Sequence, residues 1–130
     1  MIVDDHISFR RGLKLMLGEI DDIKEIVEVP DGENFLILLN DYLPDLVFLD
    51  IRLPGISGLE AACAAIKQHP LLRIIMLTMF SEEKYLKDAM EAGAKGFIQK
   101  PPTLVQLREA YFTVINGNNF FPALLQRNSC

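Results

Sequence analysis

The sequence predicts an α/β fold, a doubly wound parallel sheet of five strands in the flavodoxin-like order 2-1-3-4-5. Two observations carry this prediction. Five short apolar runs are separated by longer amphipathic stretches, so strand and helix patterns alternate along the 130 residues. Most of the runs lack strict polar–apolar alternation, which is typical of parallel strands buried on both faces. A chain of this length suits one domain with right-handed crossovers.

The expected strands are the β-branched or bulky runs at residues 2–3, 25–29, 46–49, 73–77 and 96–98. The run at 25–29 alternates polar and apolar residues, and we therefore place it at an edge of the sheet. Apolar residues at helical spacing predict helices around residues 9–17, 35–39, 59–66, 85–90 and 104–115. In the third helix, Cys63 falls among apolar positions, and we expect it to be buried.

Residues with capping chemistry stand at the expected helix starts, namely Asp31 or Gly32, Ser57, Ser81 and Thr103. Gly93 and Gly117 stand where helices are expected to end. We predict a domain over residues 1–117, followed by a linker or C-terminal tail over 118–130. Only three residues precede the acidic pair Asp4-Asp5, which leaves a clipped first strand or absent upstream residues as alternatives.

The composition narrows the class of protein. Half of the residues are hydrophobic and 24% are charged, as in a domain that buries a core rather than a disordered chain. Thirteen Lys and Arg against 18 Asp and Glu give a net charge of −5, which argues against nucleic-acid binding by this segment. Two cysteines, Cys63 and Cys130, form no disulfide framework, so we expect a reducing compartment, the cytoplasm. No apolar run approaches the roughly 18 residues of a membrane span.

Polar residues follow four of the expected strands. Asp4-Asp5 ends the first, Asp50 the third, Thr78 the fourth and Lys100 the fifth. Ligands of such sheets bind beyond the carboxyl ends of the strands, where these side chains converge. Crowded carboxylates repel unless a cation neutralises them, and Mg²⁺ suits carboxylates, water and phosphoryl oxygens. A carboxylate can also carry phosphate as an acyl phosphate, with a hydroxyl and an ammonium on its oxygens.

Four segments then give a resemblance. Residues 3–6 (VDDH), 46–58 (LVFLDIRLPGISG), 77–78 (LT) and 96–101 (GFIQKP) resemble the receiver domain of bacterial two-component response regulators. The segments occur in the order and at the separations of that family, from Ile2 to about Gly117. The Asp-His start and the Leu-Thr-Met-Phe segment are most similar to the NarL/LuxR-like subfamily, which joins a receiver to a helix-turn-helix domain.

The resemblance implies a role for each residue at the carboxyl edge. Asp50 would accept the phosphoryl group, and Asp5, Asp50 and the backbone carbonyl of Arg52 would hold Mg²⁺, with Mn²⁺ as an alternative. Asp4 would act through a water molecule bound to the metal or through contacts with the residues that bind the metal. The resemblance also gives Thr78 and Lys100 contacts with the phosphoryl group.

Further residues would connect the site to the rest of the domain. Thr78 and Phe97 stand at switch positions, where the aromatic ring turns inward as the threonine moves. The bond between Lys100 and Pro101 is expected to be cis, which a tertiary amide tolerates. Arg52 and Phe80, each two residues past a site residue, stand at positions that tune hydrolysis of the acyl phosphate.

The implied function is a signalling switch rather than an enzyme, since the domain would catalyse only its own phosphorylation and slow autodephosphorylation. A sensor histidine kinase or a small phosphodonor would supply the phosphoryl group. The surface of the fourth helix, fifth strand and fifth helix, near Tyr111 or Phe112, would then control dimerisation. It would equally serve a DNA-binding output domain on the C-terminal side of this segment.

Three other interpretations stay open. An FMN site would need a Ser-, Thr- or Gly-rich phosphate loop where Asp4-Asp5-His6 stands. An aspartate-nucleophile phosphatase typically has a second acid where Arg52 stands. A degenerate receiver used only for binding would lack part of the set Asp5, Asp50, Thr78 and Lys100. Each residue alone also fits a structural role, such as a helix cap for Asp4-Asp5 or a solvated position for Lys100.

Overall fold

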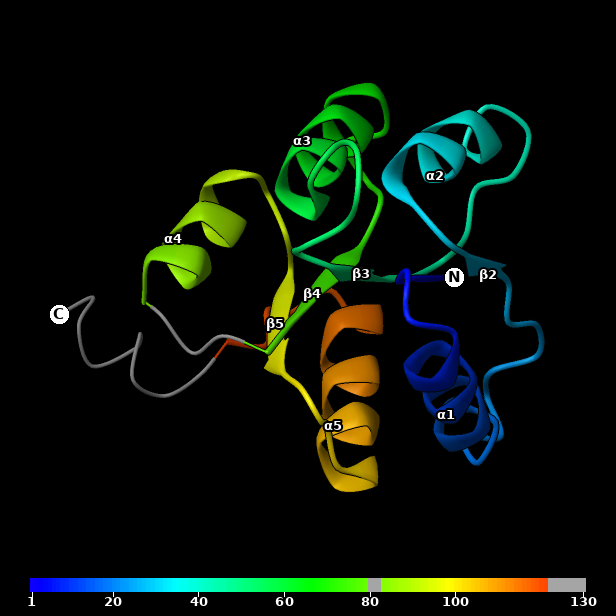
Figure 1. Cartoon of the computed structure of the whole chain (residues 1–130). Coiled ribbons are helices and arrows are strands. Elements are labelled where there is room, and N and C mark those ends of the chain that lie inside the picture. Colours follow the sequence, from blue (N-terminus) through cyan, green and yellow to red (C-terminus); the bar gives the residue numbers. More distant parts are fainter. Residues whose placement is uncertain (80–82, 122–130) are drawn as a thin grey trace, which may run out of the picture.

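A computed structural model describes residues 1–79 and 83–121 and contains the expected sheet (Figure 1). Five parallel strands pair in the order β2-β1-β3-β4-β5, which confirms the predicted fold class. In chain order the elements are β1 (Ile2–Val3), α1 (Ile7–Leu17), β2 (Glu28–Val29), α2 (Gly32–Leu38), β3 (Val47–Asp50), α3 (Gly58–Gln68), β4 (Ile74–Thr78), α4 (Glu83–Glu91), β5 (Gly96–Gln99) and α5 (Leu104–Ile115).

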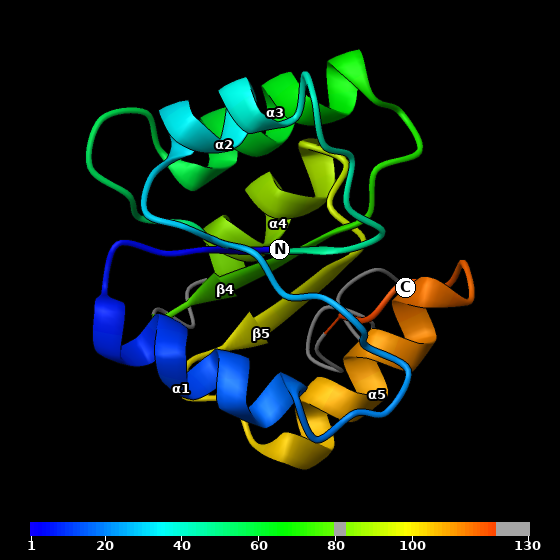
Figure 2. The same ribbon diagram turned by 90° about the vertical axis from the view of Figure 1, so that its right-hand side faces the viewer.

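The helices cover both faces of the sheet. Figures 1 and 2 show α1 and α5 on one face and α2, α3 and α4 on the other. The side chains of β4 alternate between the two layers, because Ile74 and Met76 pack on the α2–α3–α4 side and Ile75 and Leu77 on the α1–α5 side. All five residues of β4 are buried, as expected for a central parallel strand.

The predicted N-caps that lie in the described residues are found at the starts of their helices. Asp31 and Ser57 each accept a hydrogen bond from a backbone N–H of the first turn, and Thr103 forms a full capping box with Gln106. Gly93 and Gly117, at the ends of α4 and α5, have φ angles of +94° and +92°, which favour glycine. The predicted cap Ser81 lies outside the described residues.

Two expectations are wrong, one about the length of a strand and one about the burial of a cysteine. The second strand covers only Glu28–Val29 instead of 25–29, although it does lie at the edge of the sheet. Its ladder ends there because its one neighbour, β1, begins at Ile2, which pairs with Glu28. Cys63 is exposed, since α3 turns Ala61, Ala62 and Ala65 toward the sheet instead. The rotation of α3 about its own axis decides which of its sides is buried. Sequence spacing alone does not give this rotation in an alanine-rich helix.

No helix within residues 1–79 or 83–121 is both long and apolar enough to cross a membrane.

The predicted boundary at residue 117 stays a prediction. Residues 118–121 lie against β5, where Phe120 forms a bridge with Gly96. Cys130 lies outside the described residues.

Gly58, the first residue of α3, allows the helix to begin directly beneath β3. Its amide donates to the carbonyl of Ile51 at 2.7 Å, and a Cβ atom at this position would overlap the backbone carbonyl of Asp50. The close approach brings the amino end of α3 against the end of the strand that carries Asp50. Gly12 in α1 differs, because a Cβ atom there would meet nothing within 4 Å.

We expect Gly58→Ala to lower the free energy of unfolding by about 3 kcal/mol, because backbone must move to admit the methyl group. Gly12→Ala is the matched control and should raise it by roughly 0.5–1 kcal/mol, since alanine favours the helix. Urea denaturation of both variants measures the difference. Equal effects of the two substitutions would contradict the packing described for Gly58.

Candidate functional site

The carboxyl ends of the strands bring four ionisable side chains together. Ligand atoms of Asp4, Asp5, His6 and Asp50 lie within 4.8 Å of one another. Asp4 and Asp50 are buried at the ends of β1 and β3, whereas Asp5 and His6 are exposed in the turn that leads into α1. The parallel pairing of β1 with β3 places both strand ends at the same edge of the sheet.

Lys100, directly after β5, offsets part of the charge of the two buried carboxylates. Its Nζ atom donates to Asp4 Oδ2 at 2.5 Å and to Asp50 Oδ2 at 3.1 Å, and its side chain is only 7% exposed. The same ammonium lies 4.2 Å from the centre of the Phe9 ring, a cation–π contact from the first turns of α1. Lys100 therefore joins three strands of the sheet through one charge.

Asp4 is held by more than Lys100. Its Oδ1 atom accepts a hydrogen bond from the backbone N–H of His6 at 2.8 Å, and its backbone carbonyl accepts one from Arg10 at 2.7 Å. The guanidinium of Arg10 also donates to Glu28 on β2 at 3.0 Å. Both oxygens of the buried Asp4 carboxylate thus have partners, as buried charges require.

The hydrogen bonds to the Asp50 carboxylate, at 3.1 and 3.3 Å, are longer than those to Asp4. Burial raises the pKa of the Asp50 carboxyl above its usual value, Lys100 opposes this, and the negative charge of Asp4 raises it further. The backbone N–H of Arg52 donates to Asp50 Oδ1 at 3.3 Å. The net result is a buried carboxylate that is costly to ionise, which suits a site that receives a further cation.

The remaining predicted residues lie around this cluster. Thr78 is buried at the end of β4, and its backbone carbonyl accepts the amide of Lys100 at 2.7 Å. Phe97 is 4% exposed on the α2–α3–α4 side of β5, and the Lys100–Pro101 peptide bond is cis. The Arg52 guanidinium donates to the hydroxyl of Tyr85 on α4 at 2.7 Å. Phe80 lies outside the described residues.

The sequence analysis missed three contributors. Phe9 and Arg10 reach the site from α1, and Tyr85 reaches Arg52 from α4. Helical spacing identified Phe9 and Tyr85 only as core-facing positions. A helix that starts just after the acidic pair must place its first turns beside the strand ends, and this is the one signal that could have identified Phe9 and Arg10.

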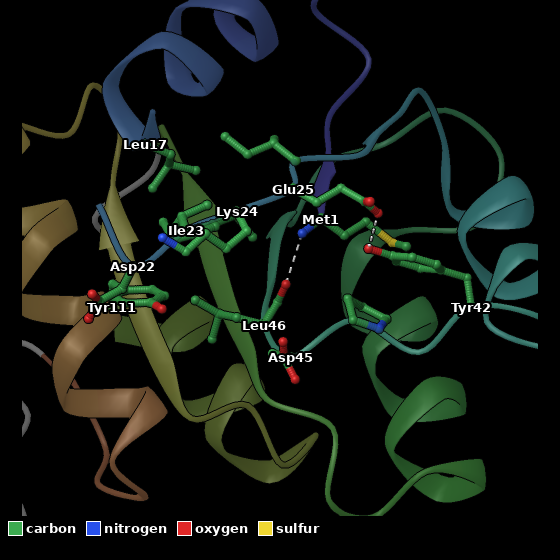
Figure 3. Close-up of a pocket in the computed structure, with 13 residues that line it drawn as sticks. Met1, Leu17, Asp22, Ile23, Lys24, Glu25, Tyr42, Asp45, Leu46 and Tyr111 are labelled. Atoms are coloured by element: carbon green, nitrogen blue, oxygen red, sulfur yellow. Dashed lines mark hydrogen bonds between the residues drawn. The ribbon is translucent and has the colours of Figure 1, made fainter. Parts of the chain in front are cut away.

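A hollow lies at the opposite edge of the sheet, where β1 and β3 begin (Figure 3). Met1, Leu46 and Tyr42 line it, and the N-terminal ammonium of Met1 donates to the carbonyl of Leu46 at 2.9 Å. Burial lowers the pKa of this ammonium to about 6. None of the predicted site residues lines this hollow, so the site chemistry belongs to the carboxyl edge.

Comparison with known proteins gives the family. A family model described as "Response regulator receiver domain" matches residues 1–112, which is most of the chain. The chain belongs to the response regulator receiver family. It is therefore a signalling module rather than an enzyme, and membership favours this interpretation over an FMN-binding protein or an aspartate-nucleophile phosphatase.

Similar proteins of known sequence or structure are also response regulators. The response regulator GacA of Pseudomonas aeruginosa is 30% identical over 128 residues, which cover 98% of this chain but 60% of GacA. A LuxR-family response regulator from Aurantimonas superposes with a TM-score of 0.90 at 28% identity, covering 97% of this chain and 91% of that one. CheY in a CheX–CheY–BeF3–Mg²⁺ complex from Borrelia burgdorferi gives 0.81 at 28%, covering 87% and 85%. These similarities confirm the predicted NarL/LuxR-like relationship.

The raised pKa of Asp50 predicts a pH-dependent effect of Asp50→Asn on stability. A raised folded-state pKa contributes stability that is present below the unfolded pKa and lost as pH rises through the folded pKa. Asparagine does not ionise, so the variant should be more stable than the native protein at pH 7. This advantage should shrink as the pH falls toward 4.

Chemical denaturation at several pH values measures this difference between the two proteins. Asp41→Asn, which changes an exposed carboxylate, is the control. An advantage of Asp50→Asn that stays constant from pH 4 to pH 7 would contradict the proposed cost of ionising Asp50.

Proposed function

We propose that Asp50 is the phosphoryl acceptor of this receiver. The observation that carries the proposal is its geometry, a buried carboxylate at the end of β3 that shares Lys100 with Asp4. An oxygen of Asp50 attacks phosphorus, the bond from phosphorus to the donor's leaving group breaks, and an acyl phosphate forms. Positioning and charge neutralisation carry most of such a transfer.

The donor set at the site fits a hard divalent cation. Asp4, Asp5 and Asp50 offer carboxylate oxygens within 4.8 Å of one another, and oxygen is the ligand that Mg²⁺ prefers. We propose that Asp5, Asp50 and the backbone carbonyl of Arg52 hold Mg²⁺, with Mn²⁺ as an alternative, and that Asp4 acts through water. When bound, the ion supplies positive charge against the carboxylates and phosphoryl oxygens. The Borrelia CheY complex contains BeF3 and Mg²⁺, which supports the choice of Mg²⁺ as the ion.

Lys100 and Thr78 are proposed to bind the phosphoryl oxygens. Lys100 already lies 3.1 Å from Asp50 Oδ2, so its ammonium needs little movement to reach an oxygen attached to that atom. Thr78 ends the strand next to β3, and its backbone carbonyl contacts the amide of Lys100. A shift of Thr78 toward the phosphoryl group would then act on Phe97 in the adjacent strand.

The output is proposed to be transcriptional. The chain spans 60% of the length of GacA, and full-length relatives carry names such as "Transcriptional regulatory protein DegU". We propose a sensor histidine kinase or a small phosphodonor as the source of phosphate. Dimerisation or a C-terminal DNA-binding domain would respond through the surface of α4, β5 and α5.

Intact mass after incubation with acetyl phosphate and Mg²⁺ tests the acceptor. We expect a gain of one phosphoryl group, about 80 Da, that is absent in Asp50→Asn and after chelation of the metal. Asp45→Asn, at an exposed position away from the strand end, is the matched control and should retain the gain. A gain of mass in Asp50→Asn equal to that of the native protein would exclude Asp50 as the acceptor.

Phe80 supports a second expectation about the site, from the sequence alone. It stands two residues past Thr78, and a bulky apolar side chain there would hinder the water that hydrolyses the acyl phosphate. Phe80→Glu should therefore shorten the lifetime of the phosphorylated protein several-fold. Loss of the added mass with time, after removal of the donor, measures the lifetime; equal lifetimes would show that Phe80 does not control hydrolysis.

A further inference from the structure

Residues 118–121, named here the strap, run along the outer edge of β5. The backbone N–H of Phe120 donates to the carbonyl of Lys95 at 2.8 Å, and its carbonyl accepts the N–H of Phe97 at 3.0 Å. Phe120 thereby forms a parallel bridge with Gly96. Since β5 is an edge strand, these two bonds pair backbone groups that the sheet itself leaves open.

The two aromatic side chains of the strap pack on opposite faces of the sheet. Phe120 packs against the core on the α1–α5 side, and Phe121 packs against the core on the α2–α3–α4 side. Gly96 makes room for this, because a Cβ atom there would lie 3.3 Å from the carbonyl oxygen of Phe120 and 3.0 Å from Ile75. Backbone pairing, apolar packing and a glycine thus agree in placing the strap on this edge.

The strap contacts the residue at the switch position directly. The bond from the Phe97 amide to Phe120 fixes the backbone of Phe97 on its outer side, while Met76 of β4 pairs with it on its inner side. The Phe97 side chain is buried in the same core that receives Phe121. A change in the position of Phe97 therefore alters both the backbone bond and the packing that hold the strap.

We propose that docking of the strap on β5 and occupation of the Asp50 site by a phosphoryl group favour each other, with Phe97 as the link. This inference rests on the proposed function. Phe97 is buried while the strap is docked. Thr78, the proposed phosphoryl ligand, is joined to β5 by its pairing with Gln99 and by the bond from the Lys100 amide to its carbonyl. By linkage, any coupling must act in both directions with the same factor. Phosphorylation would then control how firmly residues 118–121 are held on β5.

Amide hydrogen exchange of the whole chain tests the forward direction, with Mg²⁺ and beryllofluoride as the phosphoryl analogue. The amides of Phe97 and Phe120 should exchange more slowly on addition of the analogue, by about fivefold or more. The amide of Leu39, which caps α2 and donates to the carbonyl of Phe35, is an internal reference. Unchanged exchange at both amides, with beryllofluoride bound, would overturn the inference.

Variants of the strap test the reverse direction. Phe120→Pro removes the N–H that donates to Lys95, and Phe120→Ala keeps that bond but removes the packing. Each should weaken the affinity for beryllofluoride at saturating Mg²⁺, by about fivefold for the proline variant. Ile37→Ala, which removes an exposed apolar side chain from α2 on the other side of the domain, is the matched control and should bind like the native protein.

The two failures are distinguishable. If the native chain takes up neither beryllofluoride nor a phosphoryl group with Mg²⁺, the proposed function fails and the coupling fails with it. If the native chain takes up both, and the two Phe120 variants bind the analogue as tightly as the native protein, only the coupling is wrong. The alanine variant keeps this test available if the proline variant does not fold.

Discussion

The ammonium of Lys100 between the carboxylates of Asp4 and Asp50 is the interaction on which the site depends. Two buried carboxylates at neighbouring strand ends repel each other, and removal of the cation would leave both charges uncompensated. Because the three residues end β1, β3 and β5, the contact also joins strands that are far apart in sequence. A phosphoryl group on Asp50 would add negative charge to an arrangement that one lysine already balances only in part.

The fold was predictable because the signals are local and repeated. Caps such as Asp31, Ser57 and Thr103 act within one turn of helix, and the β4 run is apolar because both of its faces are covered. The errors concern tertiary context. The length of β2 depends on where its neighbour begins, and the exposure of Cys63 depends on which side of α3 meets the sheet.

The residues of the site also fall into those that sequence predicts and those that depend on tertiary context. Asp4, Asp50 and Lys100 were found from sequence because parallel strands bring their carboxyl ends to one edge, whatever the details of packing. Phe9, Arg10 and Tyr85 were missed because their contacts depend on how α1 and α4 lie over that edge. Spacing along a helix gives the face on which a residue lies, but not the polar partner that the neighbouring element brings to it.

The short β5 strand connects the site to the strap. Its residues Gly96–Gln99 lie between the strap bonds at one end and Lys100 at the other. The amide of Lys100 is bonded to the carbonyl of Thr78, and Thr78 pairs with Gln99. In the proposed coupling, a movement of Lys100 or Thr78 reaches Phe97 through this hydrogen-bonded backbone. In the proposed coupling, the strap bonds to that same backbone, and its docking energy therefore depends on the state of the carboxyl edge.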